Sequence, residues 1–286
     1  MEDDYGTTFP TDIFDHRNFT VIEPVVNLDL VMHVATCIII SIGLPLTLLT
    51  IFALCSLVRK DHVAPIFVIN LLITDLFQLC CIIVLESGTW SPLLDNIYLC
   101  PLLASIGFMV CVSLERYLVI AHPLWYRFRR NIKFSVAVCV VVWLIPPGLI
   151  VIVIHWVRMP VSALIFTIFL IIPFPLFIFF LVGTLRALST SVSVSSEEKR
   201  RIVGILVLVL LIYSCLFLPY ITCTLVEEAR FNYHLNNLSF MLVKMSPLAD
   251  LLLYIFIRKD TVGKFLAAAC CCKMERNEPT VEIVDI

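Results

Sequence analysis

Seven long apolar runs constrain the fold of this chain more than any other feature of its sequence. A helix needs about 20 apolar residues to cross a bilayer. The runs cover residues 30–57, 63–86, 97–121, 134–155, 161–188, 202–226 and 238–257. The chain is 60% hydrophobic and 15% charged, whereas soluble domains are about half apolar and about a quarter charged. We therefore predict an all-α membrane protein, a bundle of seven transmembrane helices.

The basic residues predict the orientation of the bundle. All of the 20 Lys and Arg residues except Arg17, Arg158, Arg230 and Lys244 fall on segments that are cytoplasmic when the N-terminus is outside. Cytoplasmic segments carry this excess of positive charge. We expect a multi-pass protein of the plasma membrane, inserted without a preceding signal peptide because its N-terminus is acidic. The net charge of −2 gives no support for nucleic-acid binding.

Three regions follow from these runs: an extracellular tail (residues 1–29), the transmembrane bundle (30–257), and a cytoplasmic helix and tail (258–286). In the first, Asn18-Phe19-Thr20 is a glycosylation sequon, so we expect a glycan on Asn18. A second sequon at Asn237 lies too close to the membrane for use.

The cytoplasmic region carries two membrane-anchoring signals. Residues 259–272 predict a short amphipathic eighth helix at the membrane surface. The adjacent Cys270, Cys271 and Cys272 predict palmitoylation. The end of the chain, Val284-Asp285-Ile286, has the form of a strand that could add to a PDZ domain.

Several motifs resemble those of one receptor family. Glu115-Arg116-Tyr117 ends the third run and is followed by His122-Pro123, which resembles the Asp/Glu-Arg-Tyr motif of rhodopsin-like (class A) G-protein-coupled receptors. Four other parts of the chain resemble motifs of the same family: Asn70 to Leu76, Trp143, Tyr213 to Tyr220 (with Phe217 where many members have Trp), and Asp250 to Tyr254. The resemblance covers about residues 30–272. Ser105 to Tyr117 together with Asp250 is similar to the branch of nucleotide, lysolipid and proton-sensing receptors.

The resemblance implies a receptor that transduces an extracellular ligand to heterotrimeric G proteins. It places Glu115, Arg116, Tyr117 and Tyr254 at the G-protein coupling surface. It also places Phe217 and Tyr220, with the charged Glu86 and Lys244, among the candidates for the ligand pocket.

The sequence departs from the family pattern at several positions. Thr47 stands where the first span normally has Asn, and Leu251 replaces the seventh-span Pro, which removes the usual cause of a kink. The fifth span has Pro173 and Pro175 but no Tyr a few turns later. Lys199 stands where some members have an acid that pairs with the third-span Arg.

The third span and the second outer loop are atypically short. Cys100 and Arg116 are 16 residues apart, about 24 Å of helix, which is about two and a half turns less than the family spacing. The loop near residues 156–160 has no Cys, so we expect no disulfide of the family kind. Most other cysteines lie inside apolar runs as small hydrophobes. We expect the third span to cross by local thinning of the bilayer or by reduced tilt, and to leave the wall of the ligand pocket incomplete.

Ionisable residues inside a membrane are functional candidates. Asp75 and Asp250 are expected to face each other at mid-membrane, with Ser105 and Ser246 at matching depths. Carboxylate and hydroxyl oxygens suit a hard cation, so these four residues predict a sodium site, and a sodium ion is the only cofactor we consider. Two close carboxylates also favour an added proton. The alternative without an ion is a protonated acid hydrogen-bonded to the other.

Glu86 and Lys244 are expected nearer the outside, where they form an ion pair or hold a charged ligand. Lys244 also matches the position where opsins bind retinal as a Schiff base, which keeps an opsin-like protein as a minor alternative. His33, His155 and His234 lie near the outer side, either as proton sensors or as ordinary surface residues.

Other functional classes have less support. The chain shows no inverted repeat of the transporter kind, and no nucleophile–base or metal-ligand arrangement of an enzyme. A non-signalling or regulatory truncated receptor isoform remains the main alternative to a signalling receptor, because of the short third span.

Overall fold

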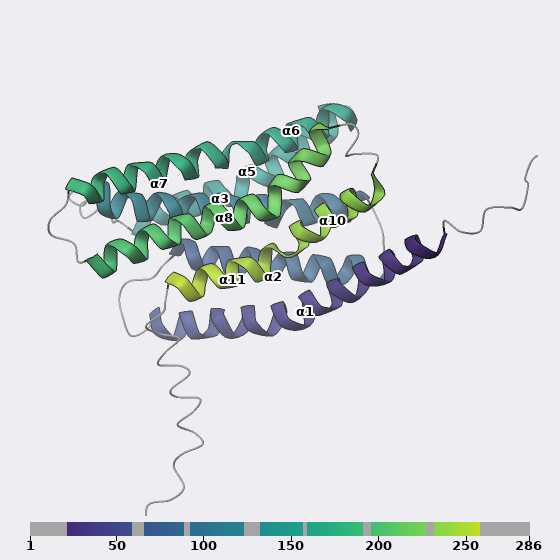
Figure 1. The fold of residues 1–286 in the computed structure, drawn as a ribbon, viewed down its shortest axis with the longest axis horizontal. Helices are drawn as coiled ribbons and strands as arrows, with labels where there is room; N and C mark the ends of the chain where they lie inside the picture. The colour runs from purple at the N-terminus through teal and green to yellow at the C-terminus, as the bar shows by residue number, and fades with distance from the viewer. Residues whose placement is uncertain are drawn as a thin grey trace, which may run out of the picture.

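The computed structural model describes residues 22–58, 66–88, 92–122, 132–156, 159–190, 196–226 and 232–257, and every regular element in these ranges is helical. The helices lie side by side in one bundle (Figure 1). They provide six spans long and apolar enough to cross a membrane, one of them formed by α6 and α7 together, and α10 with α11 counted as one span makes a seventh. The expected all-α seven-helix class is thus confirmed. The helices are α1 (Ile22–Val58), α2 (Ile66–Glu86), α3 (Pro92–Ala121), α5 (Ile132–Trp156), α6 (Met159–Ile171), α7 (Pro173–Thr190), α8 (Ser196–Leu225), α10 (Tyr233–Lys244) and α11 (Ser246–Ile257).

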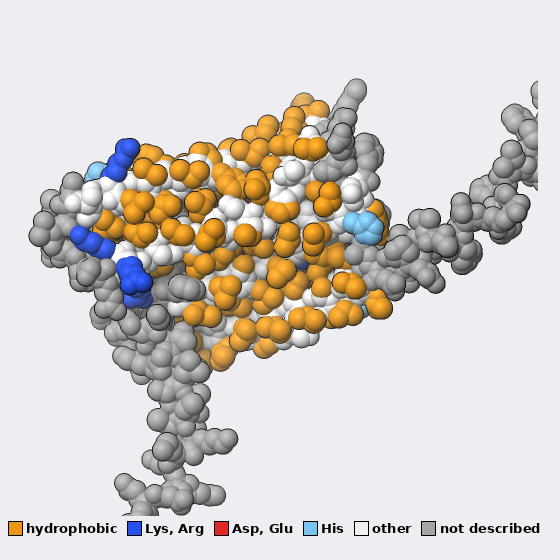
Figure 2. All heavy atoms as spheres, viewed as in Figure 1, with side chains coloured by type: hydrophobic (Ala, Val, Ile, Leu, Met, Phe, Trp, Pro, Cys, Tyr) orange, Lys and Arg blue, Asp and Glu red, His pale blue; other side chains and the backbone are white. Residues whose placement is uncertain are grey.

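The bundle is apolar outside and partly polar inside, the pattern expected when lipid is the outer solvent. Figure 2 shows apolar side chains over the middle of the bundle, with Lys and Arg gathered at the end where α7 stops and α8 starts. Phe52 is 73% exposed on this outer surface, whereas Asp75 is fully buried. α3 lies at the centre, in contact with α2, α5, α7 and α8. A movement of any of these four helices therefore changes contacts with side chains on α3.

Proline lies at a joint in two of the spans. α6 ends at Ile171 and α7 begins at Pro173, but Leu164–Ser189 still forms one span, in which the amide of Ile172 bonds to the carbonyl of Ile168 at 3.2 Å. The seventh span bends by 41° between α10 and α11, although the sequence put a kink there in doubt. Pro247 accounts for the bend, because its ring removes one helical N–H and crowds the carbonyl four residues earlier. The kink therefore exists, but it precedes the position occupied by Leu251.

The third span is not short in the structure, which corrects the expectation drawn from Cys100. α2 ends at Glu86 and is followed by a turn at Gly88, whose φ of 84° is easily adopted only by glycine. α3 begins already at Pro92. Eight residues of α3 precede Cys100 and add about 12 Å. The 30-residue helix can cross without thinning of the bilayer. None of the cysteines in the described ranges forms a disulfide, and Cys100 contacts the carbonyl of Asn96 instead.

Several expectations fall outside the described residues. They are glycosylation at Asn18, the amphipathic helix at 259–272, palmitoylation of Cys270, Cys271 and Cys272, and the PDZ-type end of the chain. The first helix begins at Ile22, within the region expected to be an extracellular tail.

Candidate functional site

The centre of the bundle holds a buried pair of carboxyl groups. Asp75 of α2 and Asp250 of α11 are 0% and 1% exposed, and their carboxyl groups lie close enough to interact directly. Ser105 of α3 donates a hydrogen bond of 3.0 Å from its Oγ to Oδ2 of Asp250. The structure thus brings together three of the four residues predicted for a sodium or proton site.

Three of the four carboxyl oxygens of this pair lack a donor among the described residues. Both oxygens of Asp75 and Oδ1 of Asp250 are buried with no protein donor among the described residues. A buried carboxylate without compensation is costly by many kcal/mol, so the pair requires a shared proton or a cation. These three oxygens and the Ser105 hydroxyl are all hard oxygen ligands, which fits a sodium ion.

Ser246 lies one helical turn before Asp250 on α11 and bonds to a residue outside the carboxyl pair. Its hydroxyl donates a hydrogen bond of 2.9 Å to Oε1 of Gln78, and both side chains are fully buried. Gln78 is three residues after Asp75, on the same face of α2. The sequence reasoning missed Gln78, although a polar residue at this spacing inside an apolar run was the available signal.

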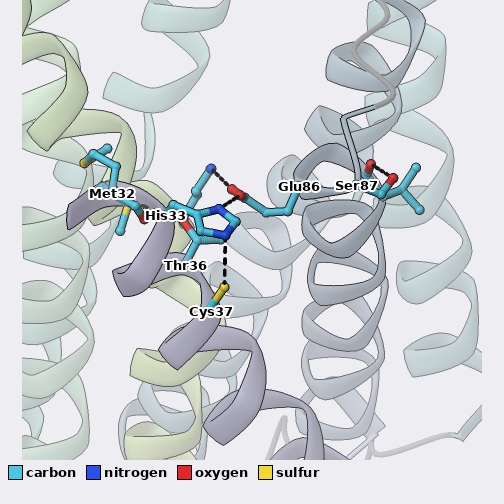
Figure 3. A network of polar contacts seen from close by, with 9 residues as sticks. Met32, His33, Thr36, Cys37, Glu86 and Ser87 are labelled. Carbon is cyan, nitrogen blue, oxygen red and sulfur yellow. Dashed lines mark hydrogen bonds and ion pairs between the residues drawn. The ribbon is translucent and has the colours of Figure 1, made fainter. Parts of the chain in front are cut away.

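A second polar group lies at the C-terminal end of α2. Oε1 of Glu86 accepts a hydrogen bond of 3.2 Å from Nζ of Lys244, which is the ion pair weighed from the sequence. Nδ1 of His33 lies 2.8 Å from the second carboxylate oxygen, Oε2. Figure 3 shows His33 of α1 facing Glu86 of α2, with Cys37 one turn along α1, its Sγ 3.7 Å from Nε2 of His33. One carboxylate therefore joins α1, α2 and α10.

The aromatic pocket candidates form a separate group. Phe217 is fully buried in the apolar core, where its ring lies 4.7 Å from that of Tyr213. Tyr220 is half-buried and packs edge-on against Phe240 of α10, with ring centroids 5.4 Å apart. Phe217 thus acts as core packing in this arrangement, and Tyr220 lines the contact between α8 and α10.

The Glu115-Arg116-Tyr117 motif lies in the last two turns of α3. A guanidinium nitrogen of Arg116 is 3.9 Å from a carboxylate oxygen of Glu115, and both side chains are about one-fifth to one-quarter exposed. Lys199 of α8, which replaces an expected acid, donates a hydrogen bond of 3.1 Å to the carbonyl of Leu188 on α7. Tyr254 packs with Leu54, Val68, Leu72 and Val112 in an apolar cluster formed by α1, α2, α3 and α11. Its ring is buried there, away from the surface on which the resemblance placed it.

Trp143 and Asn70 join two helices through side chains that the motif comparison singled out. Nε1 of Trp143 on α5 donates a hydrogen bond of 3.0 Å to Oδ1 of Asn70 on α2. Asn70 in turn donates to the carbonyl of Ile66 at 2.9 Å. These two motif residues therefore fix the position of α5 against α2.

Comparison with known proteins gives the same assignment as the motifs. The family described as 7 transmembrane receptor (rhodopsin family) matches residues 47–161. Over that part of its length the chain is similar to the rhodopsin family of seven-transmembrane receptors. G-protein coupled receptor 68 of Mus musculus is 24% identical to this chain over 291 residues, covering 83% of this chain and 78% of the relative.

Two further relatives are also receptors. The S-geranylgeranyl-glutathione receptor of Homo sapiens is 25% identical to this chain over 274 residues. The aligned part covers 80% of this chain and 76% of that receptor. A type 6 purinoceptor of Rattus norvegicus is 31% identical to this chain over 121 residues, which cover 38% of this chain and 37% of that purinoceptor. The expected placement near the branch of nucleotide, lysolipid and proton-sensing receptors is confirmed. The chain is a multi-pass membrane protein, and the relatives it matches are receptors rather than enzymes.

Proposed function

We propose that this receptor converts an extracellular signal into activation of a heterotrimeric G protein at its cytoplasmic end. An outer signal shifts the equilibrium between helix arrangements, and the shift opens a cleft around Arg116. Similarity to receptors of this family supports an extracellular ligand and a G protein as partners. The orientation with the N-terminus outside, at the plasma membrane, is part of the proposal.

One structural observation carries this proposal: a column of three polar pairs between the second and seventh spans, which we call the polar seam. From the outer end inwards, the pairs are Glu86 with Lys244, Gln78 with Ser246, and Asp75 with Asp250. Every member from α2 meets a member from α10 or α11. Polar pairs at three successive levels are costly in an apolar bundle, so we infer that they serve function rather than packing.

The bend of the seventh span lies within the polar seam. Met245 separates α10 from α11, between the outer pair at Lys244 and the middle pair at Ser246. A change at Glu86 or Lys244 therefore acts on α10, just above the bend, whereas Asp250 and Tyr254 lie on α11 below it. This arrangement gives an outer signal a route to the centre through two helix segments that can change their mutual angle.

The outer pair suggests the chemical kind of signal. Glu86, Lys244 and His33 join three helices through charge, so a proton or a small charged ligand would change the balance among them. Nucleotides and lysolipids carry charged groups of this kind. At the centre, a sodium ion or a shared proton between Asp75 and Asp250 would be a second input. The argument for a truncated isoform weakens, because α3 crosses at full length.

The proposal is tested by G-protein dissociation in cells that express the receptor. Parent and variant are exposed to stepped external pH and to panels of nucleotides and lysolipids. Arg116→Ala is expected to abolish the response while surface labelling stays unchanged. Arg186→Ala removes an exposed arginine of α7 and serves as the matched control. A response of equal size in parent and Arg116→Ala cells would refute the assignment of Arg116.

A further inference from the structure

A glycine in α7 leaves a notch that is filled by an aromatic ring from α3. A Cβ atom built on Gly183 would lie 2.6 Å from Cε2 of Tyr117, 3.3 Å from its Cδ2 and 3.4 Å from its Cζ. Real Cβ atoms essentially never approach another heavy atom within 3.0 Å. The edge of the Tyr117 ring therefore rests against bare backbone, at a distance that any side chain on residue 183 would prevent.

The Tyr117 ring is held in the notch by other aromatic groups. It stacks on Phe180, with ring centroids 5.8 Å apart and an interplanar angle of 29°. Phe179 lies at the same centroid distance at 57°, and His122 lies at 6.1 Å and 83°. Phe180 is itself only 6% exposed. The ring cannot move aside without losing these contacts, so an added methyl group would not be absorbed cheaply.

The notch lies where movement of α7 would matter. Tyr117 follows directly after Arg116, and Gly183 is five residues before Leu188, whose carbonyl accepts the hydrogen bond from Lys199. The cytoplasmic part of α7 is thus held by α3 through an aromatic contact and by α8 through a hydrogen bond. Any shift of α7 away from α3 has to separate Tyr117 from Gly183.

We propose that the Tyr117–Gly183 contact restrains α7 against α3 in the closed arrangement of the cytoplasmic end, with Gly183 as a positioning residue for signalling. This inference rests on the proposed function. In this proposal part of the control over basal signalling lies with a glycine rather than with a charged residue. It also gives Tyr117 a role within the receptor that is distinct from contact with the G protein.

The test is the substitution Gly183→Ala, which places a methyl group in the notch. Basal G-protein activation should rise about fivefold per receptor at the cell surface, the low end of typical coupling between sites. Gly148→Ala on α5 and Gly204→Ala on α8 make the same change where a Cβ would meet nothing within 4 Å. These controls account for the higher helix propensity of alanine and should leave basal activation at the parent level.

Substitutions at Tyr117, combined with Gly183→Ala, show whether the rise in basal activation depends on the Tyr117 ring. Gly183→Ala should raise basal activation as strongly in the Tyr117→Phe background, because the phenyl ring still fills the notch. In the Tyr117→Ala background the added methyl group should have no effect. Since Tyr117 also stands in the proposed coupling motif, the thermal unfolding midpoint of purified receptor is measured for the same set. Gly183→Ala should lower that midpoint in the parent and in Tyr117→Phe, but not in Tyr117→Ala.

Distinct outcomes overturn distinct parts of the argument. A Gly183→Ala receptor that matches Gly204→Ala in both measurements, or whose changes persist in Tyr117→Ala, would overturn the Tyr117–Gly183 contact. A fall in basal activation instead of a rise would overturn its assignment to the closed arrangement. The parent receptor could also give no G-protein activation while the effect of Gly183→Ala on the unfolding midpoint still depends on the ring at residue 117. In that case the proposed function and the restraint on signalling both fail, and the Tyr117–Gly183 contact serves packing alone.

Discussion

The ion pair at the outer end of the polar seam gives a prediction whose size follows from the structure. Nζ of Lys244 and Oε1 of Glu86 are 3.2 Å apart, and the two side chains are 26% and 22% exposed. At this distance the Coulomb attraction is about 5 kcal/mol for an effective dielectric constant of about 20. Loss of hydration and partial exposure to solvent offset most of it. We therefore expect a net coupling of about 1–2 kcal/mol, above that of most exposed pairs.

The two single substitutions are not expected to be equivalent. Glu86→Gln keeps the size of the side chain but leaves the Lys244 ammonium without the carboxylate that it contacts, which should cost about 2 kcal/mol. Lys244→Met leaves Glu86 in contact with His33 at 2.8 Å, so its cost should be about 1 kcal/mol. The double variant should be more stable than the sum of the single losses predicts, by the coupling of about 1–2 kcal/mol.

The assay is reversible unfolding of the purified receptor in mixed micelles titrated with a denaturing detergent. All four proteins of the cycle are measured at one ionic strength and one pH, because exposed ion pairs weaken with salt. A coupling smaller than about 0.5 kcal/mol would be no larger than ordinary departures from additivity. That result would mean that the pair holds no helices together, and it would remove the outer level of the polar seam from the proposed mechanism.

Three further predictions concern topology, the centre and the packing of α3. Epitope tags on both ends should show the N-terminus stained on intact cells and the C-terminus only after permeabilisation; C-terminal staining of intact cells would contradict the seven-span orientation. Asp75→Asn should change the sodium or pH dependence of signalling, because it removes one of two interacting carboxyl groups; identical profiles would leave a purely structural role. Gly107→Ala should destabilise the receptor by about 1–3 kcal/mol, because its Cβ would lie 2.8 Å from Cγ1 of Val142, whereas Gly148→Ala should not; equal unfolding midpoints would refute this.

The overall architecture was predictable from the sequence because it depends on composition over long segments. Each apolar run had to become a helix, since a bilayer offers no partner for an open backbone. The run ends agree with the helix ends to within three residues, except at the starts of α1, α3, α8 and α10, which lie five to eight residues before the runs. In α3, counting from Cys100 missed the turns from Pro92 onward. Those turns contain Asp95 and Asn96, and this polarity kept them out of the apolar run.

Part of the candidate site was also predictable, because polar residues stand out in an apolar run. Asp75, Asp250, Glu86 and Lys244 were chosen in this way, and the structure brings both pairs together. The hydrogen-bond partner of each oxygen could not be predicted from the sequence. Ser246 could have faced Asp75 as easily as Gln78, because the choice depends on the rotation of α11 after the bend at Met245.

The sequence by itself determined that the chain forms a helical bundle in lipid and which polar groups lie within it, because burial of apolar surface and the cost of unpaired charge act on every residue alike. Only the tertiary structure decided which helices touch, and where. Gly183 reads as an ordinary glycine in a long apolar run, and its importance appears only when α3 places the Tyr117 ring 2.6 Å from its absent Cβ. Contacts of this kind depend on the rotation and separation of two helices far apart in the chain, which close packing fixes to a fraction of an ångström and which no local pattern in either segment records.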